Sequence, residues 1–211
     1  IPGVPPHDGI RLFLPSFMFA ALLAGVGFEA IWSRAEQFRH RRVVRFGVTA
    51  MLAGGLVSMI AYAPAWLSHY SLLIGGLPGA TICGMEPTYY WDALDDHALE
   101  WLDEHTEEAA TVGFAAAPMD NLQLMREWGR FSFEPVPELQ EDTRWYVVQC
   151  RPSAWSRFDR ILFRQGRAAW EKRLASPVAV ALGLDRVPLI RVFSRRECER
   201  ISRLVTDSRT E

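Results

Sequence analysis

The chain has 211 residues, of which 49% are hydrophobic and 23% charged, and its mean hydropathy is −0.00. Its net charge is −2, and residues 68–211 carry 17 basic against 22 acidic side chains. This acidic balance excludes a protein that binds nucleic acid through a strongly basic surface. The average hydropathy conceals two hydrophobic segments, Leu12–Phe28 and Phe46–Leu67, which contain no charged residue.

The first hydrophobic segment predicts a membrane-spanning helix from about Ile10 to Trp32. The hydrocarbon core of a bilayer requires a stretch of about 18 or more residues with few charges. Pro15 falls in the first turns of this helix, where a missing N–H group costs little. Glu29 falls near the far end, where a carboxylate can reach the interface.

The second hydrophobic segment predicts another membrane-spanning helix, from about Val43 to Tyr62. Pro64 follows it, and Tyr62, Trp66 and Tyr70 provide aromatic rings of the kind found at membrane interfaces. We expect residues 1–67 to form two transmembrane helices. The alternative is a buried helical hairpin in a soluble α/β enzyme.

The connection between the two helices, residues 33–45, contains five arginines and one acidic residue, Glu36. Short loops rich in arginine remain on the cytoplasmic side of a membrane. Residues 68–211 are then extracytoplasmic, and the chain is a multi-pass protein of the cytoplasmic (inner) membrane. A nucleic-acid patch is the competing interpretation of these arginines.

Residues 68–211 alternate between strand and helix patterns, which predicts a small α/β domain with a mixed sheet. The fold class expected for the whole chain is therefore membrane α plus α/β. The elements expected, in chain order, are a loop over 75–84, a helix over 92–105, a strand over 111–117, a helix over 118–128, strands over 131–136 and 144–150, a helix capped by Ser153 that ends near Leu174, strands over 177–182 and 187–193, and a helix over 195–205.

The chain has three cysteines, Cys83, Cys150 and Cys198, with no CxxC pair and no histidine at ligand spacing. This pattern argues against a structural zinc site. Buried free thiols are expected rather than a disulfide. His97 and His105 are eight residues apart on one helix, too far to share a metal ion. We expect no metal site and no cofactor in this chain.

Three polar residues lie just before the first hydrophobic segment, at its predicted outer end: His7, Asp8 and Arg11. An arginine at the outer membrane surface can hold a lipid phosphate, because the guanidinium pairs with two phosphate oxygens. An interfacial anchor explains the same residues equally well. The acidic residues at the start of the helix over 92–105 predict a solvated helix face, with acid–base catalysis as the less favoured alternative.

Two neighbouring segments, Tyr70–Ala80 and Gly84–Asp92, are rich in glycine and aromatic residues. Aromatic rings can stack on sugar faces, and a carboxylate can accept hydrogen bonds from sugar hydroxyl groups. Aromatic rings also occur at membrane interfaces because they are amphipathic. The residue chemistry alone favours the interfacial anchor.

Several segments resemble the polyprenyl-phosphate-sugar-dependent membrane glycosyltransferases, which include protein mannosyltransferases and aminoarabinose transferases. Residues 10–31 resemble a late transmembrane segment of that family, with Arg11 before a hydrophobic stretch. YSLLIGGLPGA, from Tyr70, resembles the motif after the last span of a bacterial branch, although Ser71 and Leu72–Leu73 stand where that motif often has Asn and Glu. Three further segments resemble its later motifs: EPTYYW, RWYVVQCRPSAW and GLDRVPLIRVF.

The resemblance implies an enzyme that moves a sugar from a polyprenyl-phosphate donor to an extracytoplasmic acceptor. It implies that Arg11, with His7 and Asp8, contacts the lipid phosphate or its metal. It also implies that Tyr70, Glu86, Tyr89 and Tyr90 line the donor or acceptor cleft. The need of the full-length enzyme for a divalent metal stays open.

The chain opens with Ile1, so we expect a C-terminal portion of a longer enzyme, inactive without its N-terminal transmembrane portion. In the family, an aspartate in an early outer loop is thought to act on the acceptor, and that loop is absent from this sequence. The alternative function is a non-catalytic, membrane-tethered interaction domain of an envelope complex.

Overall fold

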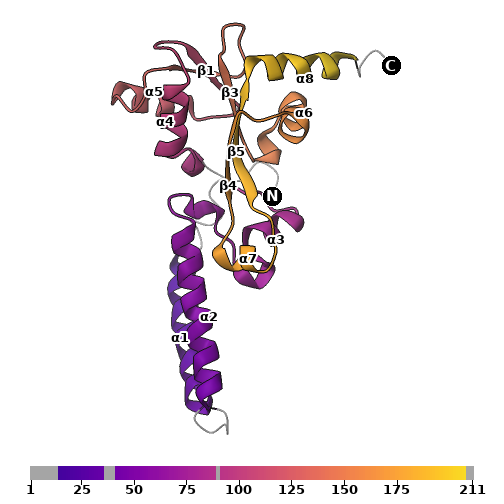
Figure 1. Ribbon diagram of the computed structural model, residues 1–211. Coiled ribbons are helices and arrows are strands. Elements are labelled where there is room, and N and C mark those ends of the chain that lie inside the picture. The colour runs from indigo at the N-terminus through magenta and orange to yellow at the C-terminus, as the bar shows by residue number, and fades with distance from the viewer. Residues whose placement is uncertain (1–13, 36–40, 89–90, 208–211) are drawn as a thin grey trace, which may run out of the picture. The chain divides into compact units, whose positions relative to one another are not determined.

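The computed structural model describes residues 14–35, 41–88 and 91–207 (Figure 1). The chain divides into two compact units, Ile1–Ala53 and Gly54–Glu211.

The first unit contains helix α1 (Leu14–Ala35) and most of helix α2 (Arg41–Ala61). Large apolar side chains on both helices are exposed, including Leu23, Val26 and Met51. Near the loop, the Arg45 guanidinium lies 5.0 Å from the ring centre of Trp32.

Among the described residues, α2 is the one helix that is long and apolar enough to cross a membrane, with a hydropathy of 1.8 in its best window. α1 is not a second candidate within these residues. The structure therefore provides one candidate span where the sequence predicts two, and the two-helix membrane portion stays a prediction.

The second unit is built around a mixed sheet of five strands in the order β2-β1-β3-β5-β4. β1 runs parallel to both β2 and β3, whereas β5 runs antiparallel to β3 and β4. The predicted mixed α/β sheet is therefore confirmed. The strands are β1 (Thr111–Phe114), β2 (Glu134–Pro137), β3 (Trp145–Gln149), β4 (Trp170–Leu174) and β5 (Val187–Ser194).

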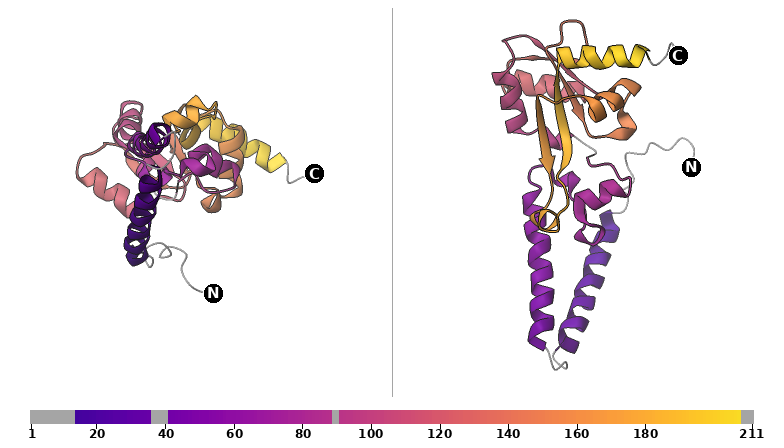
Figure 2. Two further views of the ribbon diagram at one scale, coloured as in Figure 1. Left: turned by 90° about the horizontal axis from the view of Figure 1, so that it is seen from below. Right: turned by 45° about the vertical axis from the view of Figure 1, so that its right-hand side comes forward.

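Side chains alternate between two hydrophobic cores, because successive residues of a strand point to opposite faces of the sheet. On β3, Val147 belongs to one core, whereas Tyr146 and Val148 belong to the other. Helices α4 (Asp96–Glu104) and α5 (Met119–Glu127) pack on the Val147 face, and α6 (Arg157–Gln165) and α8 (Arg195–Asp207) pack on the opposite face (Figures 1 and 2).

Short helices occupy the connections of this unit. The α-helices are α3 (Gly76–Ile82) and α7 (Pro177–Ala181), and the 3-10 helices are η3 (Trp66–Ser68), η4 (Leu72–Ile74), η5 (Trp91–Ala93) and η6 (Pro152–Ala154).

The long helix predicted from Ser153 to Leu174 is wrong. Ser156, not Ser153, caps α6: its hydroxyl accepts a hydrogen bond from the Asp159 N–H (3.1 Å), and the Asp159 carboxylate accepts one from the Ser156 N–H (3.0 Å). α6 ends at Gln165, and the chain then forms β4 at the edge of the sheet. A Cβ atom on Gly166 would lie 2.4 Å from the Leu162 carbonyl oxygen, so this close turn requires glycine.

The strand predicted over 177–182 and the loop predicted over 75–84 are also wrong, because both contain helices. Ser176 caps α7 by accepting a hydrogen bond from the Ala179 N–H (3.1 Å), and Pro177 occupies the first helical position, where proline is favoured. α3 begins after Gly75, whose left-handed backbone (φ 87°) turns the chain into the helix.

The first turn of α8 is held by Glu197. Its carboxylate accepts hydrogen bonds from the Arg167 N–H (2.6 Å) and from the Arg200 side chain (2.6 Å). These contacts join α8 to the connection between α6 and β4. The hydrogen bonds from Arg200, with that from the Arg167 N–H, lower the pKa of Glu197 to about 2.

The stability that Glu197 provides is therefore fully present above its ordinary pKa and is lost as the pH falls toward 2. In Glu197→Gln, the free energy of unfolding should fall less steeply between pH 4.5 and pH 2 than in the wild type. Urea unfolding at several pH values measures both slopes. Parallel slopes would mean that Glu197 has the same pKa in the folded and unfolded chains.

Candidate functional site

The structure brings together two of the four residues predicted to line a cleft. The Tyr70 hydroxyl donates a hydrogen bond to the backbone carbonyl of Glu86 (2.6 Å). This contact joins the two ends of a segment that leaves α2, passes through η4 and α3, and approaches the sheet. The other predicted cleft residues, Tyr89 and Tyr90, lie outside the described residues, as do the predicted phosphate-binding residues His7, Asp8 and Arg11.

The Glu86 carboxylate contacts the chain that leaves the carboxyl end of β3. One oxygen accepts a hydrogen bond from the Ser153 N–H (2.7 Å), and the other lies 3.5 Å from Nε of Arg151. The Glu86 side chain is 17% exposed and that of Arg151 is 42% exposed, so the pair lies at the edge of the surface. Glu86 thus fixes the loop after β3.

A second contact lies deeper beside the same strand. The Gln149 side-chain amide donates a hydrogen bond to the Thr88 hydroxyl (3.0 Å), and both side chains are buried. Together with the Glu86 contacts, this bond fixes residues 86–88 at the carboxyl end of β3. Gln149, Arg151 and Ser153 were not predicted as site residues, and only the resemblance of RWYVVQCRPSAW marked this segment.

The Cys150 thiol lies next to this cluster but is not an active nucleophile. Burial raises the pKa of Cys150 to about 12, although the nearby Arg191 acts in the opposite direction. Arg191 itself donates a hydrogen bond to the Glu171 carboxylate (3.0 Å) and lies 4.8 Å from the ring centre of Phe163. Because the thiolate is the reactive form of cysteine, Cys150 stays inert near neutral pH.

The three cysteines are free, as the sequence predicts, but Cys83 is exposed rather than buried. It follows α3 at the surface, whereas Cys150 and Cys198 lie in the core beside α6. Burial raises the pKa of both core thiols to about 12.

We therefore expect maleimide to label one thiol per folded chain and three after unfolding. Mass spectrometry of the labelled chain counts the adducts, and Cys83→Ser should remove the native-state label. Labelling of Cys150 or Cys198 in the folded chain would contradict the packing of this core.

The glycines between Tyr70 and Glu86 are required by the backbone. Gly75 and Gly76 have positive φ angles of 87° and 66°, which favour glycine. A Cβ atom on Gly79 would lie 1.7 Å from the Ile74 carbonyl oxygen, because α3 packs directly on η4. This part of the segment is a fixed, partly buried turn and helix, so the fold alone accounts for its glycines.

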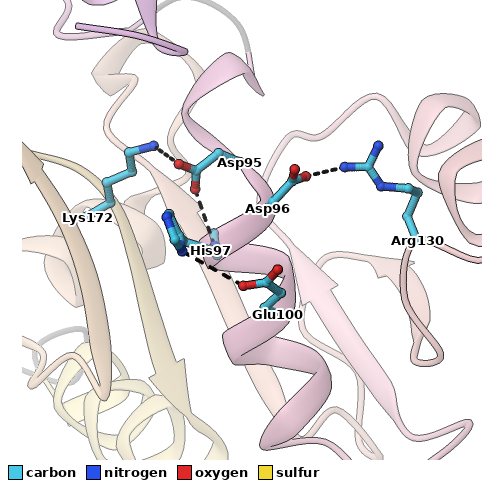
Figure 3. A network of polar contacts seen from close by, with 7 residues as sticks. Asp95, Asp96, His97, Glu100, Arg130 and Lys172 are labelled. Carbon is cyan, nitrogen blue, oxygen red and sulfur yellow. Dashed lines mark hydrogen bonds and ion pairs between the residues drawn. The ribbon is translucent and has the colours of Figure 1, made fainter. Parts of the chain in front are cut away.

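The acidic residues near the start of α4 form structural contacts (Figure 3). Asp95 caps the helix by accepting a hydrogen bond from the Ala98 N–H (3.3 Å), and its other oxygen pairs with Lys172 of β4 (2.6 Å). Asp96 pairs with Arg130. Asp95 is mostly buried, so the predicted solvated face is wrong at this position.

At the other end of α4, the Asp103 carboxylate accepts hydrogen bonds from the N–H and hydroxyl groups of Ser132, both at 2.7 Å. Over residues 14–35, 41–88 and 91–207, no group of three or more His, Cys, Asp or Glu side chains could hold a metal ion.

The arrangement at the carboxyl end of β3 places a carboxylate and a guanidinium at the edge of the surface. Such groups can bind a polar ligand through hydrogen bonds. Comparisons of the chain with protein-family models, with curated proteins and with solved structures found no match.

Proposed function

We propose that this chain is the C-terminal portion of an integral-membrane glycosyltransferase that moves a sugar from a polyprenyl-phosphate donor to an extracytoplasmic acceptor. In this proposal α1 and α2 both cross the cytoplasmic membrane, and residues 68–211 lie outside the cell's cytoplasm. The missing N-terminal transmembrane portion supplies the catalytic loop. The donor lipid and the bilayer are the partners.

The observation that carries the proposal is the joining of Tyr70 to Glu86 directly after α2. α2 has the length and apolar surface of a membrane span, and its positively charged end, with Arg41, Arg42 and Arg45, fits the cytoplasmic side. Tyr70 follows nine residues after Ala61, so the Tyr70–Glu86 contact falls close to the outer end of such a span. A site for a lipid-linked sugar must lie at that level.

Transfer by the full-length enzyme tests this proposal. With a polyprenyl-phosphate sugar in membrane vesicles, Arg11→Ala should lower the release of polyprenyl phosphate while the amount of enzyme in the membrane stays unchanged. Arg34→Ala, at the other end of the first helix, is the matched control and should leave transfer unchanged. Equal turnover of Arg11→Ala and the wild type would rule out the role of Arg11, and no transfer by the wild type would rule out the function.

The orientation of the chain has its own test. A reporter that is active only outside the cytoplasm, fused after Glu211, should be active in cells. A fusion that is active only in the cytosol would overturn the assignment of residues 68–211 to the outer side. A chain that enters buffer without detergent would instead support a soluble α/β enzyme.

The second candidate is a non-catalytic, membrane-tethered interaction domain. The observation in its favour is that Glu86, Asp95, Asp96 and Asp103 all have structural partners. The reading frame upstream of Ile1 distinguishes the two functions. About eight or more further hydrophobic spans, with an acidic residue in the first outer loop, favour the transferase, and a nearby start codon favours the tether.

A further inference from the structure

The stretch without formal charge is longer than α2. No Asp, Glu, Lys or Arg occurs between Arg45 and Glu86. α2 accounts for this stretch only up to Ala61, and the remaining residues form η3, η4 and α3. Water-exposed protein surfaces usually carry charged residues at about a quarter or more of their positions. A charge-free segment of this length is unusual for a surface that faces water.

A second charge-free segment, Leu174–Leu184, contains α7 and connects β4 to β5. The structure brings this segment to the outer end of α2. The Tyr62 hydroxyl accepts a hydrogen bond from the Leu77 N–H (3.4 Å) and also hydrogen-bonds the backbone of Ser176. A Cβ atom on Gly75 would contact the Leu184 side chain at 3.9 Å. Segments distant in sequence therefore meet beside the last turn of α2.

These segments expose large apolar side chains. Ile82 is 80% exposed, Leu182 72% and Trp66 63%. We call these residues, with their exposed apolar neighbours, the apolar base; its members are Trp66, Leu67, Ile74, Ile82, Val180 and Leu182. The last turns of α2, from Gly54, belong to the same compact unit, and they also expose apolar side chains such as Leu56 and Ile60. The apolar base is therefore continuous with the surface of the candidate span.

We infer that the apolar base lies in the interfacial layer of the lipid bilayer, with α7 and the end of α3 inserted beside the outer end of α2. This inference rests on the proposal that α2 crosses the membrane. Lipid is the occupant that fits, because the surface lacks charge, continues the apolar face of α2 and includes Trp66, a residue type enriched at membrane interfaces. A protein interface would instead have a polar rim around its apolar centre.

Insertion of the apolar base restricts how far the five-stranded sheet can tilt toward the membrane. α2 alone provides a single point of attachment, and α7 adds another that is more than 100 residues away in sequence. The Glu86 carboxylate follows three residues after Cys83, close to the end of α3, so its height above the lipid is then fixed. This arrangement holds the Tyr70–Glu86 contact at the level of a lipid-linked substrate.

A polarity-sensitive fluorophore placed at single cysteines tests this inference on the whole chain in phosphatidylcholine–phosphatidylglycerol vesicles. Cys83→Ser provides the background, since Cys150 and Cys198 are buried. Leu182→Cys and Ile82→Cys place the probe on the apolar base. Met51→Cys places it in the middle of α2, and Gln123→Cys, an exposed position on α5, is the matched control.

Probes at 182 and 82 should show blue-shifted emission and lose intensity when the vesicles contain phosphatidylcholine with a doxyl quencher near the headgroup. The probe at 123 should do neither, and the probe at 51 should be quenched best by a deep doxyl group. Quenching at 51 without quenching at 182 and 82 would overturn the inference and leave the membrane span intact. A blue shift at 182 without quenching would overturn it in favour of a protein partner. A water-exposed probe at 51 would overturn the proposed function as well.

Discussion

Replacing Gly79 with alanine should lower the free energy of unfolding of the second unit, Gly54–Glu211, by about 3 kcal/mol. The new methyl group would lie 1.7 Å from the carbonyl oxygen of Ile74 and 2.8 Å from the carbonyl carbon. Both atoms belong to the backbone, so no side-chain rotation relieves the overlap. α3 must move away from η4, which disturbs buried Leu77 and its hydrogen bond to Tyr62. Urea unfolding in detergent micelles, followed by near-ultraviolet circular dichroism, measures the loss.

Gly129→Ala is the matched control for this experiment. Gly129 also has a backbone conformation that favours glycine (φ 71°), but no atom lies within 4 Å of the position of its Cβ. Its substitution should cost only about 1 kcal/mol, the price of the left-handed backbone. Equal losses for Gly79→Ala and Gly129→Ala would show that α3 does not pack on η4 as described.

Lys172→Met should lower the free energy of unfolding by about 2 kcal/mol, because it leaves the Asp95 carboxylate without its cation in a mostly buried place. The Asp95 and Lys172 side chains are 13% and 15% exposed, and their charged atoms are 2.6 Å apart (Figure 3). The methionine retains most of the apolar stem of the lysine, so the loss reports mainly on the charge. Urea unfolding at neutral pH measures this effect.

The neighbouring Asp96–Arg130 pair provides the control. Its side chains are 69% and 48% exposed, so Arg130→Met should change the free energy of unfolding by about 0.5 kcal/mol or less. Adding Asp95→Asn to Lys172→Met removes the stranded charge and keeps a residue that can cap α4, so it should restore part of the loss. A double variant less stable than Lys172→Met alone would contradict this explanation.

The elements that were predicted well carry their signal within a short stretch of sequence. β5 has a run of apolar and β-branched residues, α8 has an amphipathic pattern, and Gly129 follows shortly after the end of α5. β4 was missed because it is an edge strand whose middle residues, Glu171, Lys172 and Arg173, are polar and whose pairing comes entirely from β5. The five apolar or small residues of α7 fit a strand or a helix equally well, and only the cap at Ser176 decides between them.

The family resemblance implied that Tyr70 and Glu86 line one cleft. In the structure the Tyr70 hydroxyl meets the Glu86 backbone carbonyl, and the cleft itself stays a prediction. The sequence could not reveal that Thr88 meets Gln149, because these residues are 61 positions apart and nothing local marks either as a partner. The partner of Asp95 is equally hidden, since Lys172 lies 77 positions later on the missed strand.

The place of β5 has a consequence for biosynthesis. It is the last of the five strands in chain order, yet it lies between β3 and β4. A nascent chain that ends before Val187 has no position for β4 in the sheet, and β3 presents an unpaired edge that invites aggregation. The five-stranded sheet therefore assembles only after Val187–Ser194 has left the ribosome, and any truncation before Val187 removes the strand that joins β3 to β4.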